Sequence, residues 1–132
     1  PGFSAEVVSL DAGAEERLER SAGMSVEDLS GFPGSVEARA FDLDGDGATE
    51  LCVEAQTTAT CSVGPVFCLM IVLGAAPDRP LLLEVAAHAI RPGPVGSLGW
   101  HELVTAHDRG EGPVETRYEM TPDGRYAPIS GQ

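Results

Sequence analysis

Hydrophobic and polar residues alternate along much of the chain beyond residue 35, and this alternation predicts β-strands. The pattern is clearest in residues 36–41 and 51–56, where every second residue is apolar. Successive side chains of a strand point to opposite faces, so such a segment buries one face and exposes the other. Only a short polar stretch separates the two segments, which predicts that they pair as an antiparallel hairpin.

Further apolar segments predict the remaining strands. Residues 67–73 form a continuous apolar run, which is typical of a buried strand. Residues 81–90 predict another strand, although their leucine and alanine content leaves a helix open. Residues 100–106 and 114–120 follow, and a short last strand begins at residue 125. Segments rich in proline and glycine separate these elements, as turns require.

The first 34 residues have a helical pattern instead. Asp11 or Ser9 can cap a helix that stops at Gly23. Ser25, with Asp28 three residues later, resembles a capping box for a second short helix. The chain is therefore expected to be α+β: an antiparallel β-sheet meander with one or two short N-terminal helices. We expect one domain over residues 1–132, with residues 1–34 packed on a sheet formed by residues 35–132.

The chain is strongly acidic, with 21 aspartates and glutamates against eight arginines and a formal net charge of −13. This charge argues against binding to nucleic acid or to anionic membrane surfaces, and it favours a basic partner. No apolar run approaches the roughly 20 residues that a membrane-spanning helix needs. No signal peptide is visible at Pro1.

Residues 42–51 carry the strongest chemical signal in the sequence. Four carboxylates occupy positions one, three, five and nine of this segment, and two glycines permit a sharp turn between them. Like charges held a few ångströms apart repel, and a bound hard cation removes that cost. Ca²⁺ prefers such all-oxygen sites. The predicted ligands are the side chains of Asp42, Asp44 and Asp46, the main-chain carbonyl of Ala48, and Glu50, directly or through water.

This segment differs from an EF-hand loop. An EF-hand has a bidentate glutamate at position twelve and a helix after it, whereas here that position is Val53 in a predicted strand. Fewer protein ligands predict a modest Ca²⁺ affinity of about 10⁻⁴–10⁻³ M and a structural role. The alternative is a solvated turn that binds no metal.

The three cysteines leave two interpretations open. A Gly-Pro turn signal lies between Cys61 and Cys68, so the two sulfurs can meet in a local disulfide, which would imply an oxidising compartment. Cys52 would then be a buried free thiol. Three free thiols are the alternative. Zinc is not favoured, because no Cys-x₂-Cys pair is present.

Other chemistry is sparse. His101 and His107 can share one strand face, but Glu102 would point to the opposite face, which disfavours a metal site built from these three residues. His88 is interpreted as a packed strand residue, and Trp100 as an anchor of the core. No nucleophile motif and no phosphate-binding glycine loop is recognisable, so no catalytic residue is predicted.

Residues 42–51 resemble the calcium loop of integrin-type FG-GAP (VCBS) repeats, which also joins two antiparallel strands. A single copy cannot build a propeller, so the resemblance implies only the hairpin. The order of features in residues 36–128 is similar to that of a group of small exported bacterial proteins, mostly uncharacterised and often lipoproteins. In that group the hairpin precedes a cysteine pair, an apolar strand, and elements like residues 99–104 and 123–128 of this chain. The resemblance implies export and no established activity.

Three functions are compatible with these patterns. The first is an exported, non-enzymatic, Ca²⁺-stabilised module that binds a basic protein or a component of the cell envelope. The second is a small metal-dependent or carboxylate hydrolase with its site near the acidic loop and His101. The third is a structural domain of a larger surface protein. The first is the preferred hypothesis.

Overall fold

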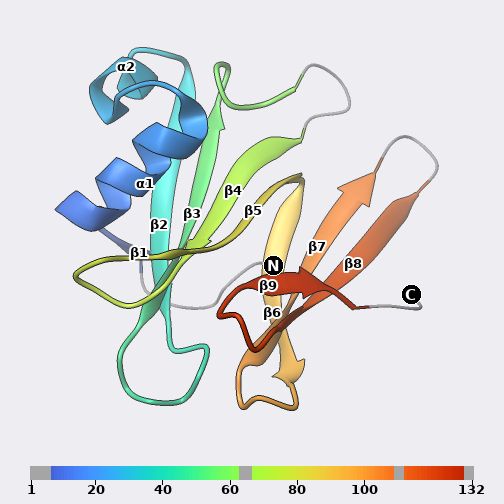
Figure 1. The fold of residues 1–132 in the computed structure, drawn as a ribbon. Coiled ribbons are helices and arrows are strands. Elements are labelled where there is room, and N and C mark those ends of the chain that lie inside the picture. The colour runs from blue at the N-terminus through green and yellow to red at the C-terminus, as the bar shows by residue number, and fades with distance from the viewer. Residues whose placement is uncertain (1–6, 63–66, 109–111, 130–132) are drawn as a thin grey trace.

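The computed structural model describes residues 7–62, 67–108 and 112–129, which form two antiparallel sheets and two short helices (Figure 1). The first sheet contains, in spatial order, β1 (Val7–Val8), β2 (Gly34–Phe41), β3 (Glu50–Thr57), β4 (Cys68–Leu73) and β5 (Leu81–Ala87). The second sheet contains β6 (Ala89–Val95), β7 (His101–Asp108), β8 (Pro113–Met120) and β9 (Tyr126–Pro128). The prediction of an antiparallel, sheet-rich fold with N-terminal helices is confirmed at this level.

Both helices begin at capping residues that the sequence predicts, and α1 also ends at the predicted glycine. In α1 (Ala12–Ala22), the Asp11 side chain accepts a hydrogen bond from the Ala14 main-chain N–H at 2.8 Å, and Gly23 ends the helix in a left-handed conformation. In α2 (Val26–Ser30), the Ser25 hydroxyl accepts from the Asp28 N–H. Both helices cover one face of the first sheet (Figure 1).

The first sheet lies between two hydrophobic cores. On one face, α1 and α2 pack on alternate residues of the central strands, including Leu51, Val53 and Ile71. On the other face, Cys52 and Met70 pack against residues of the second sheet. The strand β3 is consequently buried on both sides for most of its length. The layers are therefore helices, first sheet and second sheet.

The connection between the sheets is a single residue. Residues 81–90 contain all of β5 and the start of β6, two strands that belong to different sheets and flank His88. The helix left open for this segment is therefore wrong. None of the helices in the described part of the chain is long and apolar enough to cross a membrane.

Candidate metal site

The acidic segment connects β2 to β3, as predicted, and a buried leucine anchors it. Phe41 and Glu50 form the last pair of the hairpin ladder. Leu43, the second residue of the loop, is 1% exposed and lies in the core between the two sheets. Its carbonyl accepts a hydrogen bond of 2.7 Å from the main-chain N–H of His101 in the second sheet. The loop is thus tied to both sheets.

The aspartates shape the loop through hydrogen bonds from its own main chain. The two carboxylate oxygens of Asp42 accept from the N–H groups of Gly45 and Gly47, each at 2.9 Å. Both glycines have positive φ angles, 75° for Gly45 and 90° for Gly47, which other residues rarely adopt. The chain therefore curls around the Asp42 carboxylate.

Three of the four carboxylates of the acidic segment converge. One oxygen from each of Asp42, Asp44 and Glu50 lies within 4.8 Å of the others, so this group can hold a metal ion. Asp46 lies outside the group, and its Oδ1 accepts a hydrogen bond of 2.9 Å from the Ala48 N–H. The roles of Asp46 and of the Ala48 carbonyl as ligands stay predictions.

Glu50 is the most unusual member of the group, because it is a buried carboxylate among other acids. It is 2% exposed and accepts one hydrogen bond of 2.6 Å, from the Leu43 N–H. Burial, followed by the charges of the three loop aspartates, raises the pKa of Glu50 to about 7, although the Leu43 N–H opposes this shift. A cation between the carboxylates would favour the ionised form of Glu50 and so oppose this rise in its pKa.

The two aspartates of the group differ in how their charge is supported. The Gly47 N–H, with other hydrogen bonds of the loop, holds the pKa of Asp42 below its ordinary value. Burial and the neighbouring Asp46 raise the pKa of Asp44. A bound cation would therefore stabilise the ionised forms of Asp44 and Glu50 more than that of Asp42.

A buried arginine braces the end of the loop, and sequence reasoning missed it. The guanidinium of Arg79, in the turn between β4 and β5, donates to the Thr49 carbonyl at 2.8 Å and to the Gly74 carbonyl at 3.2 Å. It also binds the Asp11 carboxylate at 3.0 Å. Arg79 is 8% exposed. Its position between Asp78 and Pro80 reads as an ordinary polar turn, so the sequence carried no signal of this role.

The second sheet covers the site from the other side. The Tyr126 hydroxyl donates to the His101 carbonyl at 2.7 Å. Burial, together with the nearby charges of Glu50 and Asp44, raises the pKa of Tyr126. Trp100 packs partly buried against this core, with its ring edge-to-face with Tyr126 at 6.4 Å.

The histidines are not gathered into a second metal site within the described residues. His101 shares a 2.7 Å hydrogen bond between its Nδ1 and the Gly93 carbonyl. Glu102 is buried and accepts two hydrogen bonds, at 3.0 and 2.7 Å, from Arg117. His88 and His107 both make edge-to-face contacts with Phe67. In this part of the chain, the acidic loop is the one group of three or more potential ligands that converges.

The cysteines adopt one of the two arrangements that the sequence left open. Cys61 and Cys68 form a disulfide at the start of β4, with an S–S distance of 2.08 Å. Cys52 is a free thiol in the core between the sheets, and burial raises its pKa well above the ordinary value.

Comparison of the chain with models of protein families, with curated proteins and with solved structures finds no match. What the loop can bind therefore has to follow from its own geometry.

Proposed function

We propose that this chain is an exported, non-enzymatic module whose fold is stabilised by Ca²⁺ at Asp42, Asp44 and Glu50, and which binds a basic protein or cell-envelope partner. The observation that carries the metal part of this proposal is the burial of Glu50 beside two further carboxylates. An acid in such surroundings is costly unless it is protonated or meets a cation.

The donor set supports calcium as the cation. Every converging side-chain atom is a carboxylate oxygen, which hard cations prefer, whereas zinc sites are usually built from nitrogen and sulfur. Ca²⁺ also tolerates irregular geometry better than Mg²⁺ does. This suits a site with two ligands on a loop and one, Glu50, on the strand that follows.

A structural role is favoured over a catalytic one. The converging group joins the end of β2 to the start of β3, and the most deeply buried member faces the protein rather than solvent. A cation bound there stabilises the folded state, because the unfolded chain has no preformed site. Export is supported by the Cys61–Cys68 disulfide, which persists in oxidising compartments, and by the modest affinity expected of a loop with few ligands.

The test is thermal unfolding in chelator and in millimolar Ca²⁺, with Mg²⁺ as the comparison cation. At about tenfold excess over Kd, Ca²⁺ stabilises the fold by about 1.4 kcal/mol, which raises the Tm by about 5 °C. Asp44→Asn should abolish most of this increase. Asp78→Asn is the matched control, because Asp78 is an exposed acid outside the loop and its loss changes the net charge equally.

The outcomes separate a specific site from general charge screening. A Tm increase that is lost in Asp44→Asn and kept in Asp78→Asn supports the proposal. Identical melting curves in chelator and in Ca²⁺ reject it. If Ca²⁺ raises the Tm of Asp44→Asn and Asp78→Asn equally, the rise comes only from charge screening of a highly acidic chain.

A further inference from the structure

Next to β1, the edge of the first sheet carries main-chain groups with which no described residue pairs. The Thr58 N–H donates to the Pro33 carbonyl, which makes residues 33 and 58 a hydrogen-bonded pair just before the β2–β3 ladder. Such pairs alternate along an antiparallel ladder. The main-chain groups of Ser35 and Glu37 therefore form the hydrogen bonds to β3. The N–H and C=O groups of Gly34, Val36 and Ala38 point away from β3, outward from the sheet edge.

The strand β1 covers only one end of this outward row. Val8 pairs with Ala38 and Val7 with Arg39. The chain then leaves the sheet and enters α1 after Asp11. Among the described residues, none pairs with the outward N–H and C=O of Gly34 or Val36. Four hydrogen-bonding groups on two residues are therefore available to a further strand.

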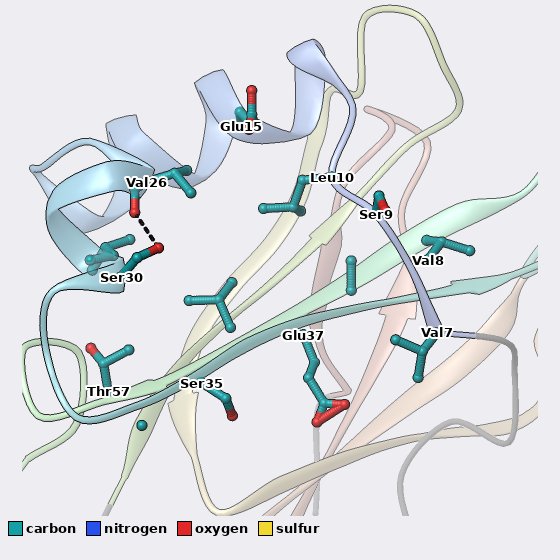
Figure 2. Close-up of a pocket in the computed structure, with 14 residues that line it drawn as sticks. Val7, Val8, Ser9, Leu10, Glu15, Val26, Ser30, Ser35, Glu37 and Thr57 are labelled. Carbon is teal, nitrogen blue, oxygen red and sulfur yellow. Dashed lines mark hydrogen bonds between the residues drawn. The ribbon is translucent and has the colours of Figure 1, made fainter.

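These groups border a groove between the sheet edge and the helices (Figure 2). The groove has a volume of about 490 Å³. Its apolar lining comes from Leu10 before α1, from Val26 and Leu29 of α2, and from Val36 of β2. Such a groove accepts apolar side chains that point to the helix side of an added strand.

The opposite face of the same edge is negatively charged. Figure 2 shows Glu37 pointing away from α1 and α2, on the other side of β2. Glu37 and its cross-strand neighbour Glu54 share one cation, Arg39, at 3.4 and 3.8 Å. Burial, with the charge of Glu37, raises the pKa of Glu54 although Arg39 opposes it. Within the described part of the chain, Glu37 and Glu54 together have only Arg39 as a cationic partner, so one negative charge is left that a second cation can neutralise.

We propose that an extended segment of a partner protein binds here as an additional strand beside Gly34–Val36, with apolar residues in the groove and basic residues on the opposite face. Alternation of side chains along a strand produces this pattern in the ligand. A basic side chain opposite Ser35 lies diagonal to Glu37, within reach of an arginine. The inference rests on the partner-binding part of the proposed function and gives it a location.

The probe is a fluorescein-labelled peptide with the sequence Arg-Val-Arg-Val-Arg-Val, and binding is measured by fluorescence anisotropy. In the bound strand, the valines face the groove, and their N–H and C=O groups face β2. The matched control peptide carries N-methyl groups on the valine nitrogens, so that it has the same charge but cannot donate to β2. We expect it to bind about tenfold more weakly or worse.

The matching protein variants alter the edge itself. Val36→Pro removes the outward N–H and leaves the bonds to β3, because that N–H points away from β3. It should weaken binding of the unmethylated peptide by about tenfold, whereas Val36→Ile should leave binding near the wild-type level. Glu37→Gln should weaken binding by about two- to fivefold. Circular dichroism checks that each variant folds. If Val36→Pro does not fold, the comparison of the methylated and unmethylated peptides on the wild-type protein still tests the proposal.

Several outcomes overturn the proposal. Equal binding of both peptides to the wild-type protein would show attraction to general negative charge only, and the absence of binding would reject the edge as a site. A wild-type dimer that Val36→Pro converts to a monomer would make a second copy of this chain the occupant. All titrations are run in chelator and in Ca²⁺, so that peptide binding without a calcium-dependent Tm rejects the metal role and leaves the strand site standing.

Discussion

Glu50 accepts a 2.6 Å hydrogen bond from the main-chain N–H of Leu43, and this contact closes the base of the acidic loop. Both residues are almost fully buried, at 2% and 1% exposure. One is a carboxylate and the other an anchor of the core between the sheets. The same contact therefore positions a charge for a cation and ties the loop to the hydrophobic core.

Glu50→Gln should stabilise the metal-free protein and lose that advantage when Ca²⁺ is present. Glutamine keeps an oxygen that accepts the Leu43 N–H but carries no charge. In chelator at pH 8, the variant should melt about 5 °C or more above the wild type, because the cost of a buried ionised acid is gone. In millimolar Ca²⁺, the advantage should disappear, since the variant binds the ion about tenfold more weakly or worse. A variant that is less stable than wild type in chelator would contradict this account.

The metal-free protein should lose stability as the pH rises from about 4.5 to about 7. Over this window the folded state keeps the proton of Glu50, whose pKa is about 7, while the unfolded state has already released it. Unfolding then releases a proton, so a higher pH favours the unfolded chain by about 2–3 kcal/mol in total. The quantity to measure is the difference in urea unfolding free energy between wild type and Glu50→Gln at several pH values. A difference that does not vary with pH would reject the buried titration.

The local elements were predictable because their signals are local. Asp11 and Gly23 delimit α1, and Ser25 caps α2, through contacts within four residues. The hairpin and its acidic loop followed from alternation and from charge spacing. The pattern also placed Glu50 among the candidate ligands, and it lies with Asp42 and Asp44 in the structure.

What escaped prediction depends on contacts between distant segments. Alternation shows that β3 has two faces, but it cannot show that both are covered, by helices on one side and by a second sheet on the other. The division of residues 81–90 at His88 is of the same kind. Arg79 is buried only because acceptors from three segments meet around it, at Asp11, Thr49 and Gly74.

Loss of Arg79 should destabilise the protein far more than loss of a surface arginine. Arg79→Ala removes the guanidinium from which the Thr49 carbonyl, the Gly74 carbonyl and the Asp11 carboxylate accept hydrogen bonds, at a cost of about 3 kcal/mol. The control is Arg20→Ala, which breaks an exposed pair with Glu16 and should cost less than about 0.5 kcal/mol. Urea unfolding compares the two. Since Arg79 also holds the Thr49 carbonyl, its loss should weaken Ca²⁺ binding, which Arg20→Ala should not do.

The thiol of Cys52 should not react with thiol reagents until the protein unfolds. It lies in the core between the sheets, and burial raises its pKa well above the ordinary value, so little reactive thiolate is present at neutral pH. Ellman's reagent should therefore detect almost no thiol in the native protein. In denaturant without reductant it should detect one thiol for each chain, and after reduction it should detect three, because Cys61 and Cys68 are joined. Three thiols detected before reduction would show that Cys61 and Cys68 are not joined. The disulfide would then no longer support an oxidising compartment for this chain.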